Sequence, residues 1–159
     1  MAEPIAELIA QNIKAAIESV NAGEVVEGNA YHYTLKPLRP LRVDYENVKW
    51  NNHDVIIRQM DSGPSAAAQL RVRRVLNFAL SAICIDSIDS STTIDTHQNR
   101  VAADIEKALQ VDTTRGGYAL FTEVGDAVPF ESDELELTGI LIDVAVHYSI
   151  MEKDPYTNG

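Results

Sequence analysis

Apolar residues recur every three or four positions over about residues 4–20, and this spacing predicts an amphipathic helix with one buried face. Pro4 suits the first turn of that helix, because the N–H group that proline lacks would have no helical partner there. Gly23 can adopt the left-handed backbone conformation that often follows a helix. The first predicted element is therefore a helix whose apolar stripe packs on a core.

The same spacing returns over about residues 95–110, where Val101 and Ile105 belong to a second apolar stripe. This pattern predicts a second helix. Arg100 and Asp104 are four positions apart in it. We expect them to pair on the outer face of the helix, with a stabilisation of about 0.3 kcal/mol.

The clearest alternation of apolar and polar residues covers about residues 135–150 and predicts a long antiparallel strand with one buried face. Asp143 and His147 fall on the polar side. The apolar side consists of Ile140, Ile142, Val144, Val146, Tyr148 and Ile150. At about 3.3 Å per residue such a strand would exceed ~45 Å. A strand that overruns its own sheet is available to pair or pack with a neighbouring copy.

Two prolines interrupt another strand pattern nearer the start of the sequence. Residues 31–35 alternate between apolar and polar side chains, which predicts a half-buried strand. Pro37 and Pro40 follow. Because proline cannot donate to the hydrogen-bond ladder of a sheet, the stretch of about 36–50 is predicted to be an edge strand or a bent, extended arm.

Shorter patterns predict the remaining elements. Residues 55–57 form a short apolar strand, and the turn-forming residues 61–65 form a loop. Helix and strand compete over 71–86, where the β-branched and aromatic content favours a strand. Residues 86–93 are rich in Ser, Thr and Asp and predict a loop that ends in helix-capping residues. A further strand is expected over 118–123, after a turn that contains two glycines.

The predicted order is helix, three strands, helix, two strands. This order indicates a single α+β domain over residues 1–159, with an antiparallel or mixed sheet of about four to five strands and two helices packed on one face. Residues 151–159 are predicted to be a polar tail after the last strand. Tyr156 either anchors that tail on a neighbouring copy or is frayed with it.

Charge is distributed unevenly along the chain. The formal net charge is −11, yet residues 31–80 carry a net +4 while residues 81–159 carry a net −11. An acidic protein repels nucleic acid at long range, which argues against duplex binding as its main role. Identical copies could meet with the basic part of one against the acidic part of the next, a head-to-tail contact that yields rings or filaments. Alternatively, both parts are only solvated surfaces.

No arrangement of residues in the sequence points to catalysis or to a cofactor. There is no glycine-rich phosphate loop, and the single cysteine, Cys84, lies in an apolar run typical of a core. Asp143 and His147 share one side of a strand but stand about 13 Å apart, too far for a dyad. The histidines are scattered without metal-ligand spacing: His32, His53, His97 and His147. We therefore expect no enzyme activity, no metal and no cofactor. No apolar run is long enough to cross a membrane.

The most unusual local feature is an arginine cluster beside a strongly apolar strand. It consists of Arg71, Arg73 and Arg74, and other basic residues lie upstream. One interpretation is a patch that docks a partner. The other is that charges at a strand end discourage wrong edge pairing. The candidate residues for a subunit or partner interface are Lys36, Arg39, Arg42, Arg71, Arg73, Arg74, Asp143, His147 and Tyr156.

Several short motifs together resemble one family over nearly the whole chain. They are Asp104-Ile105-Glu106-Lys107-Ala108-Leu109, Asp112, Gly116-Gly117, Thr122-Glu123, Gly139 leading into Val144-x-Val146-x-Tyr148, and Asp154-Pro155-Tyr156. In these positions and in its order of elements, the chain resembles the tail terminator (tail completion) proteins of long-tailed bacteriophages. The arginine cluster belongs to no pattern of that family.

This resemblance implies a structural virion protein that is made in the host cytoplasm. It implies a six-membered ring that caps the head-proximal end of the tail tube and ends tube polymerisation. The implied partners are further copies of the chain, the tail tube protein and a neck or head connector protein. DNA would pass through the acidic lumen without specific binding. A head–tail connector or head-completion protein of the same particle is the alternative, and a small ligand-binding module or hydrolase is less favoured.

Overall fold

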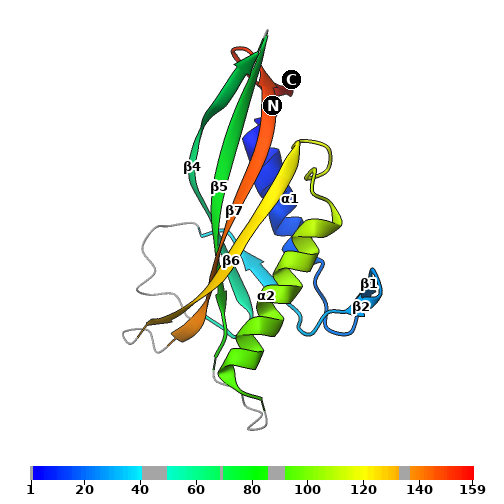
Figure 1. Cartoon of the computed structure of the whole chain (residues 1–159), viewed down its shortest axis with the longest axis vertical. Helices are drawn as coiled ribbons and strands as arrows, with labels where there is room; N and C mark the ends of the chain where they lie inside the picture. Colours follow the sequence, from blue (N-terminus) through cyan, green and yellow to red (C-terminus); the bar gives the residue numbers. More distant parts are fainter. Residues whose placement is uncertain (1, 41–49, 69, 86–91, 133–136) are drawn as a thin grey trace.

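The computed structural model describes residues 2–40, 50–68, 70–85, 92–132 and 137–159. It confirms an α+β fold, in which a mixed sheet carries two helices (Figure 1). The helices are α1 (Ile5–Glu18) and α2 (Ile94–Val111). The strands are β1 (Val25–Val26), β2 (Asn29–Ala30), β3 (Lys36–Leu38), β4 (Asp54–Ala68), β5 (Arg71–Ile83), β6 (Phe121–Ser132), β7 (Leu137–Met151) and β8 (Asp154–Asn158).

The main sheet has six strands in the order β3-β4-β5-β7-β6, and β8 pairs with the end of β7 beyond β6. Its strand pairs are antiparallel except that β3 runs parallel to β4. Strands β1 and β2 form a separate small hairpin that projects beside α2 (Figure 1). The parallel edge strand β3 contains Pro37, which confirms the predicted edge position of this proline.

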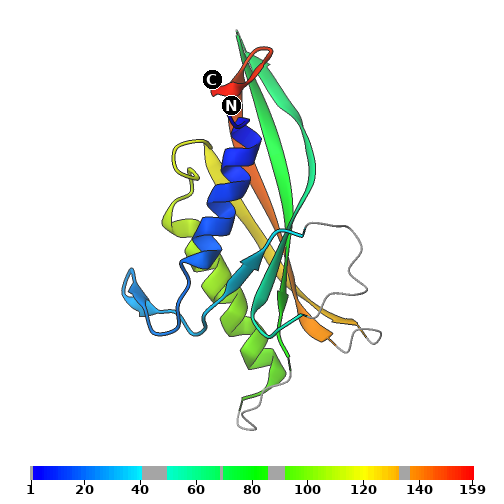
Figure 2. The ribbon, with the colours of Figure 1, turned by 180° about the vertical axis from the view of Figure 1, so that it is seen from behind.

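Both helices lie on the same face of the sheet, as the view from behind shows most clearly (Figure 2). The alternation along β7 produces this packing. Its apolar residues, from Ile140 to Ile150, are at most 4% exposed and face the helices. Helix α1 meets them with its own buried stripe, which includes Ile9 and Ile13. The predicted helix at 4–20, the predicted helix at 95–110 and the buried face of the last strand are therefore confirmed.

The length of β7 is confirmed, but the expectation that this strand overruns its own sheet is wrong. Its 15 residues correspond to about 50 Å of strand. However, β7 does not overrun the sheet, since β5 pairs with it over Gly139–Met151 while β6 and β8 share its other edge. Among the described residues, the outer edges of the sheet are formed by other strands: by β6 on one side, and on the other side by β3 and the part of β4 beyond Ile56, where β3 ends.

Strand β4 is much longer than the three-residue strand predicted from the sequence. The turn-forming residues at 61–65 do not make a loop, because they lie within β4 and pair with β5. The register with β5 shifts between Gln59 and Ser62 and again between Pro64 and Ala66. Two such irregularities let an edge strand accommodate glycine and proline without ending.

The predicted strand at 31–35 is absent, because the carboxylate of Asp104 binds its backbone. The N–H groups of His32 and Tyr33 donate to Asp104 at 2.9–3.1 Å instead of to a neighbouring strand. Asp104 is only 2% exposed. The expected surface pair between Arg100 and Asp104 is therefore also wrong, since Asp104 faces the interior and fixes the 31–35 segment to α2.

The end of the sequence is also more ordered than the predicted polar tail. Residues 154–158 form β8, in which Asp154 lies opposite Met151 and Asn158 lies opposite Ile150. The start of α1 lies near β8 (Figure 2). The turn at Gly116 and Gly117 has φ angles of +72° and +89°, which favour glycine. Most of the predicted arm at 36–50, namely 41–49, and most of the predicted loop at 86–93 lie outside the described residues.

Candidate assembly surface

In the described part of the chain, no helix covers the second face of the sheet, which we call the uncovered face. Its side chains come from the residues that alternate with the core positions. Val75 and Ala79 on β5 and Leu141 and Ala145 on β7 are half-buried there. On the opposite face, neighbouring residues such as Phe78 are 1% exposed. The sheet thus presents one face to the helices and one face to its surroundings (Figures 1 and 2).

The arginine cluster lies at the end of the sheet where β4 and β5 meet, past the start of α1 (Figure 1). Arg71 and Arg73 are exposed and lie on the uncovered face, opposite Met151 and Ser149 of β7. Leu70, in the tight turn just before them, is 66% exposed. We call Leu70, Arg71 and Arg73 the basic tip.

Arg74 points to the other face, because it is one residue further along the strand. It lies opposite Tyr148 on β7 and is half-buried. Burial raises the pKa of Tyr148, and the nearby positive charge of Arg74 partly offsets this rise. The three arginines that the sequence placed in one cluster are therefore divided between two faces of the sheet.

The other side of the sheet is acidic. No Lys or Arg occurs between Arg115 and Lys153, a stretch that includes all of β6 and β7. Glu123, Asp126 and Asp143 are exposed there. Gly125 permits the close approach of β6 to β7 at this point, because a Cβ atom on it would lie 2.9 Å from the backbone oxygen of Asp143. The chain of β6 is irregular at this glycine, where its register with β7 shifts between Val124 and Ala127.

His147 belongs to the same acidic side and is held by two contacts from β6. Its Nε2 atom lies 3.5 Å from a carboxylate oxygen of Glu123. Its ring stacks on Phe121, with ring centroids 4.2 Å apart and planes inclined by 14°. Asp143 and His147 do not meet, as their spacing on the strand predicts.

The remaining candidate interface residues have varied surroundings. Arg39 makes a bidentate pair with Glu7 of α1, at 2.7 and 3.0 Å, which lowers the pKa of Glu7. Lys36 is exposed at the start of β3, and Tyr156 is 51% exposed on β8. Arg42 lies outside the described residues. Arg39, directly after β3, therefore fixes the end of this strand to α1 within one copy.

A mostly apolar groove of about 210 Å³ lies on the uncovered face at the end of the sheet opposite to the basic tip. Ile83 of β5 is 2% exposed at its base. The groove is lined by Trp50, Ile56, Arg58, Ser81, Ile83, Phe130, Ser132 and Leu137. This lining makes the uncovered face more apolar at that end than at the tip.

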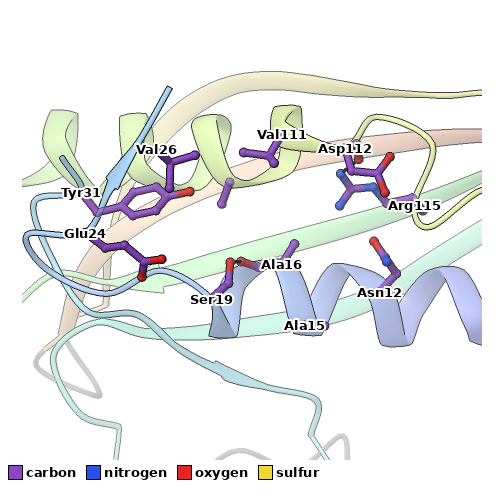
Figure 3. A pocket seen from close by; sticks show the side chains of 11 residues that line it. Asn12, Ala15, Ala16, Ser19, Glu24, Val26, Tyr31, Val111, Asp112 and Arg115 are labelled. Atoms are coloured by element: carbon purple, nitrogen blue, oxygen red, sulfur yellow. Dashed lines mark hydrogen bonds between the residues drawn. The ribbon is translucent and has the colours of Figure 1, made fainter. Parts of the chain in front are cut away.

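A second hollow, of about 310 Å³, lies between the two helices (Figure 3). Arg115 at its end is fully buried, and its Nη2 atom donates to the backbone oxygens of Leu109 and Asp112, which closes the C-terminal end of α2. Its Nε and Nη1 atoms have no partner in the described part of the chain. Because these atoms are sealed from solvent, and because Glu24 and Asp112 also line the hollow, it is unsuited to an anion.

Two of the histidines predicted to be scattered are in contact. The Nε2 atoms of His53 and His97 lie 2.8 Å apart, and Tyr33 stacks on His53 with ring centroids at 4.5 Å. Burial lowers the pKa of both histidines. Nothing in the spacing of positions 53 and 97 indicated this contact.

Among the residues with described positions, no group of three or more His, Cys, Asp or Glu side chains is placed to hold a metal ion.

Comparison with known proteins gives no relative for this chain: no family model matches it, and no curated protein matches it. In the described parts of the chain, no helix has the length and apolar character needed to span a membrane. The arrangement of charge and of uncovered surface is thus the most informative feature for function.

Proposed function

We propose that this chain is a structural virion protein that forms a ring on the head-proximal end of a bacteriophage tail tube. In this role it ends polymerisation of the tube and offers a surface for joining the neck or head. One observation carries the proposal: the sheet has an uncovered face and is charged oppositely on its two sides. Strands β3–β5 contain five Lys or Arg and two acids, whereas β6–β8 contain five acids and no Lys or Arg.

Opposite charge on the two sides favours a head-to-tail contact between copies. If the same side of two copies met, like charges would face each other, which is unfavourable. When the basic side of one copy meets the acidic side of the next, the first copy keeps a free acidic side and the second keeps a free basic side. Further copies can then add in the same way. Such an interface closes into a ring when the rotation per copy divides a full turn.

The net charge also fits a channel for DNA. At −11 per copy, a ring of the chain repels phosphate, so DNA passes without being held. The tail tube protein and a neck or head connector protein are the proposed partners on the two faces of the ring. Six copies is the number that the resemblance to tail terminators implies.

The proposal is tested by adding the purified chain to polymerising tail tube protein and measuring tube lengths by electron microscopy. We expect shorter tubes as the concentration of the chain rises, with one end of each tube capped. A chain with reversed charge on α1, Lys14→Glu, is the matched control, since Lys14 is exposed on the helix layer. Unchanged tube lengths and uncapped ends would contradict the proposal.

A head–tail connector or head-completion protein would use the same surface between copies and is the second candidate. Particles that lack the chain distinguish the two. Overlong tails indicate a terminator, whereas filled heads without an attached tail of normal length indicate a connector.

A further inference from the structure

We infer that the basic tip of one copy docks on an acidic patch of the next copy, formed by Glu123, Asp126 and Asp143 on β6 and β7. This inference rests on the proposed ring and names the two surfaces that would form it. The occupant of the acidic patch is thus a second copy of this chain, presented through the β4–β5 turn.

The basic tip has the composition of a docking element. Leu70 is 66% exposed between two strands and offers an apolar contact, with Arg71 and Arg73 beside it on the uncovered face. Arginine is enriched at interfaces because its planar guanidinium can bind a carboxylate through two hydrogen bonds. Within the described ranges, neither Arg71 nor Arg73 has an ion-pair partner.

The acidic patch has the complementary composition. Its three carboxylates lie between two exposed apolar residues of β6, Phe121 at 44% and Val128 at 57%. Both apolar residues are on the uncovered face, opposite His147 and Leu141 of β7. Carboxylates flanked by apolar residues on one surface therefore match an apolar residue beside two arginines on the other.

The two surfaces cannot satisfy each other within one copy. Arg73 lies opposite Ser149, whereas Glu123 and Asp143 lie level with positions 145 and 143 of β7, four and six residues away, which corresponds to about 13 and 20 Å along the strand. Pairing between them therefore requires a neighbouring copy. Two other arginines are unsuited to the role, because Arg39 is already paired with Glu7 and Arg74 points to the opposite face.

Charge reversal tests the pairing directly. We expect the variant Arg71→Glu/Arg73→Glu and the variant Asp126→Lys/Asp143→Lys each to weaken assembly at least about tenfold, measured by sedimentation of the chain with tail tube protein. A mixture of the two variants should assemble again, because each acidic tip then meets a basic patch and each normal tip meets a normal patch. The control Lys14→Glu/Arg100→Glu makes the same charge change as Arg71→Glu/Arg73→Glu, but on exposed helix positions, and should leave assembly unchanged.

The charge-reversal experiment distinguishes failure of the inferred pairing from failure of the proposed ring. If the wild-type chain forms rings and both reversed variants do so equally well, the inferred pairing is overturned while the proposed ring stands. If each variant fails alone, keeps the wild-type circular dichroism spectrum and is not rescued by mixing, the pairing is also overturned. If the wild-type chain forms no ring with or without tube protein, the proposed function itself fails.

Discussion

The two faces of the main sheet are made by the same strands, yet neighbouring residues on them have different surroundings. On β5, Phe78 is 1% exposed beneath the helices, whereas Arg73 and Val75 lie on the uncovered face. The covered face holds the domain together through burial of apolar area. The uncovered face contributes less to folding and is therefore available for contacts between copies. Substitutions should separate these two tasks.

The largest effect on stability is expected on the covered face. Phe78→Ala should lower the free energy of unfolding by about 3–5 kcal/mol, because it removes a fully buried ring and leaves a cavity. Val75→Ala on the uncovered face should cost about 1 kcal/mol or less. Urea denaturation of both variants measures the difference. Equal losses would show that the uncovered face is as important for folding as the core.

The next effect concerns the attachment of the 31–35 segment to the helix layer. Asp104→Ala should cost about 2–3 kcal/mol, because two partly buried backbone N–H groups lose their charged acceptor. Glu106→Ala, two residues further along α2 and exposed, should change stability by about 0.5 kcal/mol or less. Thermal and urea unfolding check both values. An unchanged free energy of unfolding in the Asp104→Ala variant would contradict the structural role of this carboxylate.

A smaller effect should appear with pH at the contact between His53 and His97. Both pKa values are below the ordinary value of 6.5 in the folded state, so the unfolded state takes up protons first as the pH falls. The free energy of unfolding should therefore decrease as the pH drops below about 6.5. Asp104 nearby raises the pKa of His53, and Arg100 lowers that of His97, so both belong to the same balance.

The double variant His53→Asn/His97→Asn provides the matching control for this pH dependence. It should show a flatter dependence of stability on pH between about 7.5 and 5.5, measured by urea denaturation at each pH. Carboxylates with lowered pKa values, such as Glu7 and Asp112, act only at lower pH. An unchanged slope in the double variant would rule out the histidine pair as its source.

The smallest effect on folding is expected from the tip. Arg71→Glu/Arg73→Glu should change the free energy of unfolding of the monomer by about 0.5 kcal/mol or less, because both side chains are exposed. The tip should affect association between copies more than folding. Assembly of the wild-type chain should weaken as the salt concentration rises from about 0.05 to 0.5 M, since salt screens the attraction between the basic tip and the acidic patch. A large loss of monomer stability would place the tip among the folding determinants.

The elements predicted well from sequence are those in which one face is continuously buried. The stripe of α1 and the alternation of β7 both extend over four or more core contacts, so periodicity alone locates them. The segments 31–35 and 61–65 were predicted wrongly because partners distant in sequence determine them. Asp104 supplies acceptors for the first, and pairing with β5 keeps the second extended despite its glycine and proline.

The candidate surface was predictable in charge but not in geometry. The basic and acidic parts of the sequence do correspond to two sides of the sheet. The alternation within β5 could have separated Arg73 from Arg74, since adjacent strand residues face opposite ways. The pairing of Arg39 with Glu7 and the contact of His53 with His97 depend on tertiary packing, for which no spacing in the sequence gives a signal.

The most direct test of an assembly role is the mass of the chain in solution, measured by analytical ultracentrifugation at low salt with and without tail tube protein. A ring of six copies of the 17.5 kDa chain would have a mass of about 105 kDa. We expect a closed species of about that mass in the presence of tube protein. A 17.5 kDa monomer at every concentration, with no association with the tube, would contradict it.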